Sequence, residues 1–395
     1  MTERSFVCFA GEDWWYHGRA HANLQVTREL SRYGRALVVN SIGMRFPTPG
    51  KTEAPMMRIR RKLRSMMRPL RRPLPGYRDL WVMTPISVPM YGVPVLRKIN
   101  ATFVALQVWI VARLLLRMRD PWTIIVVPTA IDVVDRLGWR KILYYRADNH
   151  ASAADVNHDL IRSMEDRLFA QAAHVFYASS ALMEAERDRS GRNARFLDHG
   201  VELDHFVLRP QLDEPADLAR VPRPIIGFYG QIESQWIDIE LLRQLAVEIP
   251  EASLVLIGTS TSEMWDLRAK RNVRFLGWRD YEVIPRYGQR FDVAICPFLD
   301  NEWVRASNPI KIKEYLAQGC PVVSRYIPNL ERHSDVVTLV KTNDEFVDAV
   351  RDILRNGTSS TPEQRRSAVL ADGWDQRARM VLALCDEADA RMNPA

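Results

Sequence analysis

The sequence lacks the features that mark several large protein classes. Its 395 residues include only 4 cysteines, which are scattered and lie mostly within apolar runs. They form neither a disulfide framework nor a Cys-x-x-Cys metal site. No secretory leader is visible, and the longest apolar stretch, residues 101–116, is too short and too interrupted by polar residues to span a membrane. We therefore expect a soluble or peripheral protein in a reducing cytoplasm.

Three phosphate-binding signatures are also missing. No Gly-x-Gly-x-x-Gly follows a predicted strand, which disfavours a nicotinamide or flavin site. No Gly-x4-Gly-Lys-Ser/Thr occurs, which excludes a P-loop NTPase, and no Asp-x-Asp is present to hold a metal–diphosphate group. An enzyme that releases a diphosphate without that pair must neutralise it with side-chain cations and helix dipoles, so we expect no metal.

Positive charge is concentrated in one segment. The net charge is +7, from 55 basic and 48 acidic residues. Eight of the basic residues lie between Arg58 and Arg72, without an intervening acid and interleaved with methionine, isoleucine and leucine. This mixture favours docking on anionic lipid. A solvated loop is the first alternative, and nucleic-acid binding, which no aromatic interleaving supports, is the second.

Strand-like runs alternate with helical patterns along the chain, which predicts a parallel α/β architecture. The first series of expected strands is 5–10, 35–40, 79–83, 123–128, 141–145 and 174–178, with helices over 19–32, 99–118 and 151–171. The second series is 224–229, 253–257, 273–276, 292–297, 321–324 and 336–340. The proline-containing residues 208–224 separate the series. We expect two α/β domains, 1–207 and 222–373, and a C-terminal helical segment, 374–395.

The most informative segment is Ser307–Ser324, which has the pattern of a loop, a helix, a glycine stop and a buried strand. We expect Asn308 to cap the helix and Pro309 to occupy its first turn. Lys311 lies in that first turn, where a helix N-terminus favours anions, and Glu314 follows on the same face. These residues suit a nucleoside diphosphate, with phosphates at the helix start and ribose hydroxyls on the carboxylate. The alternative is a surface helix with an ordinary Lys–Glu pair.

This segment resembles the nucleotide-binding signature of GT-B glycosyltransferases of group 1, or family 4, which have two Rossmann-like domains facing across a cleft. The resemblance implies that residues 1–207 and 222–373 are these two domains and that the C-terminal helix, 374–395, crosses back to the first domain. In that family a glutamate ends a Glu-x7-Glu motif and precedes Ala, Gly and a Pro-Val-Val strand. Glu314 matches the second glutamate, whereas Ala306 replaces the first. The Pro-x-Lys-x-x-Glu-Tyr-Leu-Ala version is similar to bacterial polysaccharide enzymes, including the teichuronic-acid type and the membrane-associated xanthan-type glucuronosyltransferase.

The resemblance implies an activity and its partners. A sugar would pass from a nucleotide-sugar donor, UDP- or GDP-linked, to a saccharide acceptor carried on a lipid, during exopolysaccharide or surface polysaccharide assembly. The enzyme would work without a metal, peripherally on the cytoplasmic face of the membrane. The missing first glutamate, together with the aspartate described below, favours inversion at the anomeric carbon.

Two further loops match the donor side of this family. Gly230 and Gln231 follow the first strand of the second domain, where a glycine lets the backbone approach a diphosphate; a simple strand-to-helix turn is the alternative. Trp278 and Tyr281 follow the third strand and are placed to stack on the base, although packing within the domain is also open. The expected donor set is Gly230, Gln231, Trp278, Tyr281, Ser307, Asn308, Lys311 and Glu314.

The catalytic base is expected after the fifth strand of the first domain. Arg146, Asp148 and His150 leave that strand together. Asp148 is placed like the general base of the xanthan-type inverting relatives, with His150 as the reserve base. Capping of the following helix is the plain alternative for these residues.

The loop after the first strand resembles the acceptor-binding loop of the family. It carries Trp14, Trp15, His17 and Arg19, with Asp13 as a rival base. The spacing of His17 and His21 also permits a metal, which we do not expect. Residues 197–206 resemble the element that closes the first domain of these enzymes, and they do not indicate which substrate is used.

Two other functions stay open at this point. One is a UDP-sugar 2-epimerase on the same fold, whose further acidic and histidine motifs are not found. The other is a binding or scaffold protein without turnover, which the missing first glutamate of the motif permits.

Overall fold

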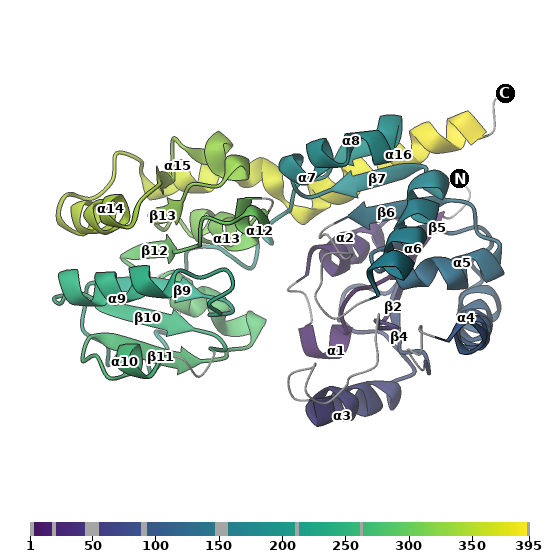
Figure 1. The fold of residues 1–395 in the computed structure, drawn as a ribbon, viewed down its shortest axis with the longest axis horizontal. Coiled ribbons are helices and arrows are strands. Elements are labelled where there is room, and N and C mark those ends of the chain that lie inside the picture. The colour runs from purple at the N-terminus through teal and green to yellow at the C-terminus, as the bar shows by residue number, and fades with distance from the viewer. Residues whose placement is uncertain are drawn as a thin grey trace. The chain divides into compact units, whose positions relative to one another are not determined.

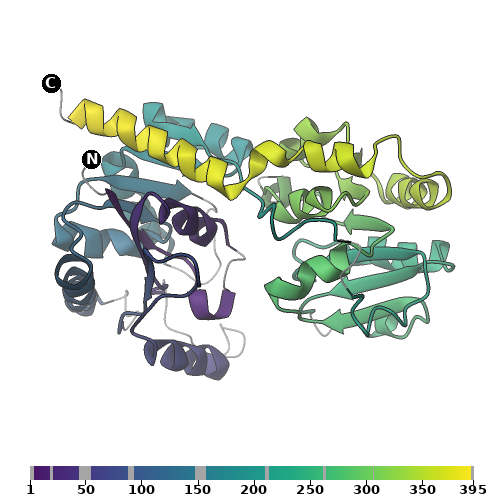
Figure 2. The ribbon, with the colours of Figure 1, turned by 180° about the vertical axis from the view of Figure 1, so that it is seen from behind.

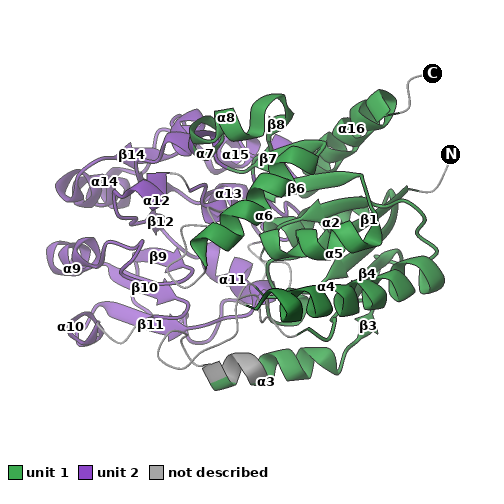
Figure 3. Ribbon diagram, turned by 45° about the vertical axis from the view of Figure 1, so that its right-hand side comes forward, with its two compact units in different colours: residues 1–178, 182–198, 374–395 green, residues 179–181, 199–373 purple. Residues whose placement is uncertain are grey.

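The computed structural model describes residues 4–17, 21–43, 55–87, 93–146, 157–209, 213–260, 264–305 and 307–392. The chain divides into two compact units, drawn in two colours in Figure 3. Unit 1 comprises Met1–Ala178, Leu182–Asp198 and Trp374–Ala395, and unit 2 comprises Ser179–Ala181 and His199–Gly373. Each unit has its own cluster of buried apolar side chains. Residues 199–207, expected at the end of the first domain, therefore lie in unit 2.

Unit 1 is built on an eight-stranded sheet in the order β3-β4-β2-β1-β5-β6-β7-β8 (Figure 1). Among the described residues every pairing is parallel except that of β3 with β4. The strands are β1 (Arg4–Phe9), β2 (Gly34–Val39), β3 (Leu70–Arg71), β4 (Leu80–Met83), β5 (Trp122–Ile125), β6 (Ile142–Arg146), β7 (His174–Tyr177) and β8 (Ala194–Phe196). The short strands β3 and β8 were not expected from the sequence.

Helices cover both faces of this sheet, and the C-terminal helix packs against α2 (Figure 2). They are α1 (Trp14–His17), α2 (Ala22–Leu30), α3 (Pro55–Met66), α4 (Pro94–Trp109), α5 (Ile131–Leu137), α6 (His158–Gln171), α7 (Ser180–Ala185), α8 (Arg187–Ser190) and α16 (Trp374–Met392). Helix α6 begins after Asn157, whose side chain caps Leu160 N. Charged groups on α16 pair with other residues of unit 1: the Asp389 carboxylate, for example, lies 2.9 Å from the Lys141 ammonium.

The expectation that the longest apolar stretch is too short and too interrupted to span a membrane is wrong. Helix α4 continues directly into a π-helical stretch, η2 (Ile110–Leu115), so the apolar helix runs without a break from Pro94 to Leu115. By length and composition alone these 22 residues could cross a membrane. The polar residues that interrupt the sequence do not end the helix, because Gln107 bonds the backbone of Ile86 and Arg113 is exposed.

Unit 2 has a parallel six-stranded sheet in the order β11-β10-β9-β12-β13-β14. Its strands are β9 (Ile225–Tyr229), β10 (Ser253–Ile257), β11 (Val273–Gly277), β12 (Val293–Cys296), β13 (Val322–Arg325) and β14 (Thr338–Val340). In chain order this is 3-2-1-4-5-6, the arrangement of doubly wound nucleotide-binding sheets. β9, β10, β12 and β13 are buried along their whole length, as expected for a parallel sheet covered on both faces.

The helices of unit 2 lie between these strands in the chain. They are α9 (Ile239–Glu248), α10 (Trp265–Arg268), α11 (Ile284–Gly288), α12 (Glu302–Arg305), α13 (Ile310–Ala317), α14 (Asn343–Asn356) and α15 (Pro362–Ser367). Gly319 has φ +73° just after α13 and ends the helix as the sequence predicts. Asn308 is not at the N-cap position: Pro309 holds it and makes no side-chain capping hydrogen bond.

Candidate functional site

The strongest candidate site lies at one end of the unit 2 sheet. Strands β9 and β12 are neighbours there, but the chain leaves them in opposite directions, toward β10 and toward β13. Doubly wound sheets bind ligands at this switch point, outside the carboxyl ends of the strands. Gly230 follows β9, and Lys311 and Glu314 lie on α13, between β12 and β13. The residues expected to bind the phosphates and the ribose therefore lie on the elements that flank the switch point.

Gly230 is fitted closely to Lys311. Its φ of +140° lies in a region that side-chain-bearing residues rarely adopt. A Cβ added there would stand 2.8 Å from the Lys311 Nζ and 3.2 Å from its Cε. The loop after β9 can thus approach the ammonium only because residue 230 is glycine, which exceeds what a simple turn requires.

Lys311 presents a cation in a partly apolar setting. Its Nζ lies 4.8 Å from the ring centre of Phe228 and 5.3 Å from that of Phe298. Among the described residues it has no ion-pair partner within 4 Å, and burial lowers the pKa of its ammonium. A nearby diphosphate would favour the charged form of the ammonium, and the free N–H groups in the first turn of α13 would bind the same anion.

Glu314 is buried, with only 6% of its surface exposed. Burial raises the pKa of its carboxyl to about 7, against the opposing influence of the Tyr229 hydroxyl and the Lys311 ammonium. The Glu202 carboxylate adds to the upward shift. A carboxyl of this kind is costly as an isolated anion, and it gains when hydroxyl donors arrive to hydrogen-bond the ionised form.

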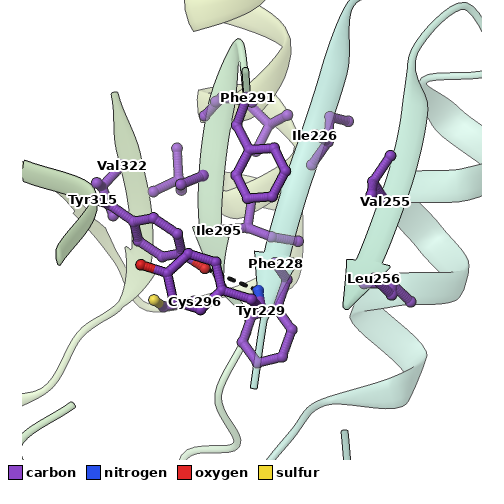
Figure 4. Close-up of a cluster of buried hydrophobic side chains, with 14 of the residues drawn as sticks. Ile226, Phe228, Tyr229, Val255, Leu256, Phe291, Ile295, Cys296, Tyr315 and Val322 are labelled. Atoms are coloured by element: carbon purple, nitrogen blue, oxygen red, sulfur yellow. Dashed lines mark hydrogen bonds between the residues drawn. The ribbon is translucent and has the colours of Figure 1, made fainter. Parts of the chain in front are cut away.

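The site rests on a tightly packed aromatic support (Figure 4). The Tyr315 hydroxyl accepts a hydrogen bond of 3.0 Å from the Tyr229 N–H, and their ring centres are 4.5 Å apart. Phe291 lies beside both rings. This packing fixes the end of β9 against α13, so it holds the residues just beyond Tyr229 in place relative to Glu314.

The expected base-binding aromatics have different surroundings. Trp278 is 60% exposed. The Tyr281 ring stacks on His205, with centres 4.8 Å apart, and its hydroxyl donates to Glu202 at 3.4 Å. One face of Tyr281 is thus already occupied by a residue of the chain, whereas Trp278 is accessible.

Glu202 and His205 are residues of this cluster that the sequence did not assign to it. Both lie in the 197–206 element, which the sequence treats as a closing turn. The sequence shows a glutamate and a histidine in that element, which could have suggested a role at the site. Only folding, however, brings Glu202 near Glu314.

The remaining donor candidates lie around the same end of the sheet. Gln231 is exposed directly after Gly230. The Ser307 hydroxyl donates to the Val304 carbonyl at 2.7 Å, and the Ser307 carbonyl accepts from Asn329 at 2.8 Å. Asn308 is partly buried. These contacts shape the approach to α13.

In unit 1 the loop after β1 is held by its own polar groups. The Asp13 carboxylate accepts from Trp15 N at 2.9 Å and from Asn40 Nδ2 at 3.3 Å. Trp14 is 5% exposed, and the Trp15 indole donates to Thr84 at 3.3 Å. Trp15 is therefore the more accessible of the two tryptophans, and Asp13 has a structural task in this loop.

The basic segment reaches the same loop. The Arg68 guanidinium lies 5.1 Å from the ring centre of Trp15, and that of Arg61 lies 5.4 Å from the ring centre of Tyr16. Lys62 donates to the Ser41 carbonyl at 2.7 Å, and burial lowers the pKa of its ammonium. Part of the segment is thus a helix that packs on unit 1, which a freely solvated loop would not do.

The expected base region is only partly described. Asp148, His150 and Arg19 lie outside the described residues, as does the side chain of His17. Arg146, at the end of β6, is fully buried and pairs with Glu165 at 2.7 Å and Glu186 at 2.8 Å. Arg146 therefore anchors the strand that leads to Asp148, and it is not itself presented to a ligand. No group of three metal-ligating side chains occurs in the part of the chain that the structure describes.

Comparisons with known proteins agree with this geometry. Residues 223–356 match the family described as Glycosyl transferases group 1. Over 265 residues the chain is 24% identical to TuaH of Bacillus subtilis (strain 168), described as a teichuronic acid biosynthesis glycosyltransferase. That match covers 62% of this chain and 66% of the relative, just under two thirds of its length.

Solved structures share the fold over the whole chain. Sucrose-phosphate synthase from Thermosynechococcus elongatus has a TM-score of 0.67 at 16% identity, covering 98% of this chain and 100% of that one. HepE from Anabaena, solved with UDP and glucose, has a TM-score of 0.58 at 15% identity, with both chains covered in full. The expected GT-B fold is confirmed, and the resemblance to group 1 glycosyltransferases is confirmed for residues 223–356. The fold of the chain is GT-B, and its residues 223–356 form a glycosyl transferases group 1 domain.

Proposed function

We propose that this protein transfers a sugar from a nucleotide-sugar donor to a saccharide acceptor carried on a lipid, in bacterial surface polysaccharide assembly. The observation that carries the proposal is the convergence of Gly230, Lys311 and Glu314 at the switch point of a group 1 domain. HepE, which shares the fold, was solved with UDP and glucose, which favours a UDP-sugar over a GDP-sugar as the first donor to try.

The donor would bind with its two phosphates at the start of α13. The Lys311 ammonium would neutralise the charge that develops on the diphosphate as it leaves, together with the helix N-terminus. The Glu314 carboxylate would accept hydrogen bonds from the ribose hydroxyls. Trp278 would supply an accessible ring for the base. This division of tasks needs no metal ion, which supports a metal-independent reaction.

The transfer itself would be a single displacement. The acceptor hydroxyl attacks the anomeric carbon, a new carbon–oxygen bond forms, and the bond to the diphosphate breaks with its electron pair on the leaving oxygen. The hydroxyl proton passes to a general base, for which the Asp148 carboxylate is our first candidate and the His150 imidazole and the Asp13 carboxylate are the others. Trp15, with Trp14, His17 and Arg19 beside it in sequence, would hold the acceptor.

Attachment to the membrane would involve the basic segment. Arg60 and Arg64 are exposed on α3, while Arg61 and Arg68 lie over the rings of the loop proposed for the acceptor. Each basic residue near an anionic surface contributes about 1 kcal/mol. Replacing Arg60 and Arg64 by serine should weaken binding to anionic vesicles, most clearly at low salt.

Nucleotide release tests the proposal directly. The protein is incubated with UDP- and GDP-sugars, with and without polyprenyl-diphosphate saccharides, and nucleoside diphosphate is measured. Release that requires an acceptor supports transfer. Interconversion of the free UDP-sugar without an acceptor would indicate an epimerase. Tight donor binding without turnover of any pair would indicate a binding protein, and either result would overturn the proposal.

A further inference from the structure

The long apolar helix of unit 1 has two different faces. Its inner face, made of Ala101, Val104, Ala105, Val108 and Ala112, is buried in the core of unit 1. Its outer face carries large apolar side chains that are between 38% and 59% exposed, at positions three or four residues apart: Leu96, Ile99, Phe103, Leu106, Ile110 and Leu114. Such spacing aligns the six side chains in one stripe, about 27 Å long.

A stripe of this size is not ordinary protein surface. Single exposed apolar side chains are common, but contiguous apolar patches mark interaction sites. The inner face is part of the core, so the helix cannot leave unit 1 to cross a bilayer without exposing that core. The stripe therefore fits a partner that covers one face of the helix and leaves the other in place.

Charge identifies that partner. From Ala54 to Arg119 the sequence has 14 basic residues and only one acid, Asp79, so the rest of the chain has 41 basic and 47 acidic residues, a net charge of −6. Lys98, Arg113 and Arg117 on or beside the stripe are exposed. A second copy of this chain would bring like charges together, whereas an anionic lipid surface complements both the charge and the apolar stripe.

The basic helix α3 is fixed near the same end of strand β4. The Ser65 hydroxyl on α3 lies 3.2 Å from that of Thr84, and the Gln107 side chain on α4 bonds the Ile86 backbone twice at 2.9 Å. Helix α3 also exposes Leu63, at 59%. The basic helix and the apolar helix are thus both held by residues that follow strand β4, two positions apart.

We propose that the outer face of α4–η2 inserts into the interface of an anionic membrane, with the helix axis along the surface. This deepens the proposed function, because it names the surface by which the enzyme would reach a lipid-linked acceptor. It also differs from attachment by the basic segment alone, because apolar insertion places the stripe among acyl chains and survives salt that screens charge.

A polarity-sensitive dye reports insertion site by site. The native cysteines Cys8, Cys296, Cys320 and Cys385 are all buried, so a cysteine placed on the surface can be labelled selectively. With Leu106→Cys carrying the dye NBD, vesicles of phosphatidylcholine with about 30% phosphatidylglycerol should shift its emission to the blue. Val247→Cys, at an equally exposed apolar position of α9, is the matched control and should show no shift.

Substitution measures how much the stripe contributes. The triple variant Ile99→Gln, Leu106→Gln and Leu114→Gln should bind the anionic vesicles at least tenfold more weakly, roughly, since three apolar side chains no longer enter the interface. The control triple Val247→Gln, Trp265→Gln and Leu370→Gln, also exposed, should bind as the native chain does. Should the first triple fail to fold, the dye on the single cysteine variant still decides.

Two results would overturn the inference. One is vesicle binding without a blue shift at position 106, which would leave attachment to the basic segment. The other is a lipid-free dimer that the first triple abolishes, which would show that a second copy covers the stripe. The test uses no donor, so insertion in a protein that transfers no sugar would refute only the proposed function.

Discussion

The affinity for a nucleotide-sugar donor should depend on pH through Glu314. Burial raises the pKa of this carboxyl to about 7, so a large share of the free protein carries the neutral acid near neutrality. Ribose hydroxyls donate best to the ionised carboxylate, which has only acceptor sites. The donor should therefore bind the ionised form and displace a proton from the protein.

The magnitude follows from the pKa. With a pKa of about 7, the ionised fraction rises from about 0.1 at pH 6 to about 0.9 at pH 8. Donor affinity should rise about tenfold over this range, or about 1.4 kcal/mol. At about pH 6.5, roughly 0.8 proton should be released for each donor bound.

Titration calorimetry in buffers of different ionisation enthalpy measures the affinity and the proton release together. UDP-glucose suits the experiment because its diphosphate does not titrate in this range, and GDP-mannose serves as the second donor. Glu314→Gln should weaken binding at the higher pH by roughly 1.5–3 kcal/mol, flatten the pH profile and abolish the proton release. Glu251→Gln, at an exposed position, is the control. Proton release that persists in Glu314→Gln would refute the reasoning.

Folding stability should change with pH in the direction opposite to donor affinity. The folded pKa of Glu314 is above its ordinary value of 4.5, so the folded chain holds more protons than the unfolded chain between about pH 4.5 and 7. The free energy of unfolding should therefore fall as pH rises through this window, by up to about 3 kcal/mol. Urea denaturation should show that Glu314→Gln removes this loss and is the more stable protein at high pH. Equal pH slopes for the two proteins would contradict the burial argument.

Four further outcomes are expected. Lys311→Ala should weaken a nucleoside diphosphate by roughly 1.5–3 kcal/mol and the free nucleoside much less, and an equal loss for both ligands in calorimetry would remove its phosphate role. Gly230→Ala should lower the melting temperature and donor affinity, at a cost of about 1–3 kcal/mol, because its φ is +140° and its Cβ would press on Lys311. Asp148→Asn should abolish turnover and leave UDP affinity intact, since a base acts on the transition state; full activity would move the role to His150 or Asp13. Arg146→Met should destabilise unit 1 by about 3–5 kcal/mol, because two glutamates would stay buried without their cation, and thermal unfolding measures this.

The sequence by itself determined the architecture. Its alternation of short apolar runs with helical patterns predicts twelve of the strands in their order, because a strand buried on both faces of a parallel sheet is a short run of apolar residues. The signature around Lys311 and Glu314 predicts a helix, its glycine stop and the following strand, since these depend on residues only a few positions apart. Gly319 ends the helix for the local reason expected, a positive φ.

Only the tertiary structure decided which side chains meet. The approach of Gly230 to Lys311, the place of Glu202 beside Glu314 and the burial that raises the pKa of Glu314 all join segments far apart in sequence. The same is true of the polar residue in the apolar helix: the sequence predicts the helix through Gln107, but only the folded chain supplies the partner of this side chain, the backbone of Ile86 after strand β4. Its apolar composition does not say which face is buried, and that face is set by packing against the core of unit 1, so the exposed stripe appears only in the folded chain.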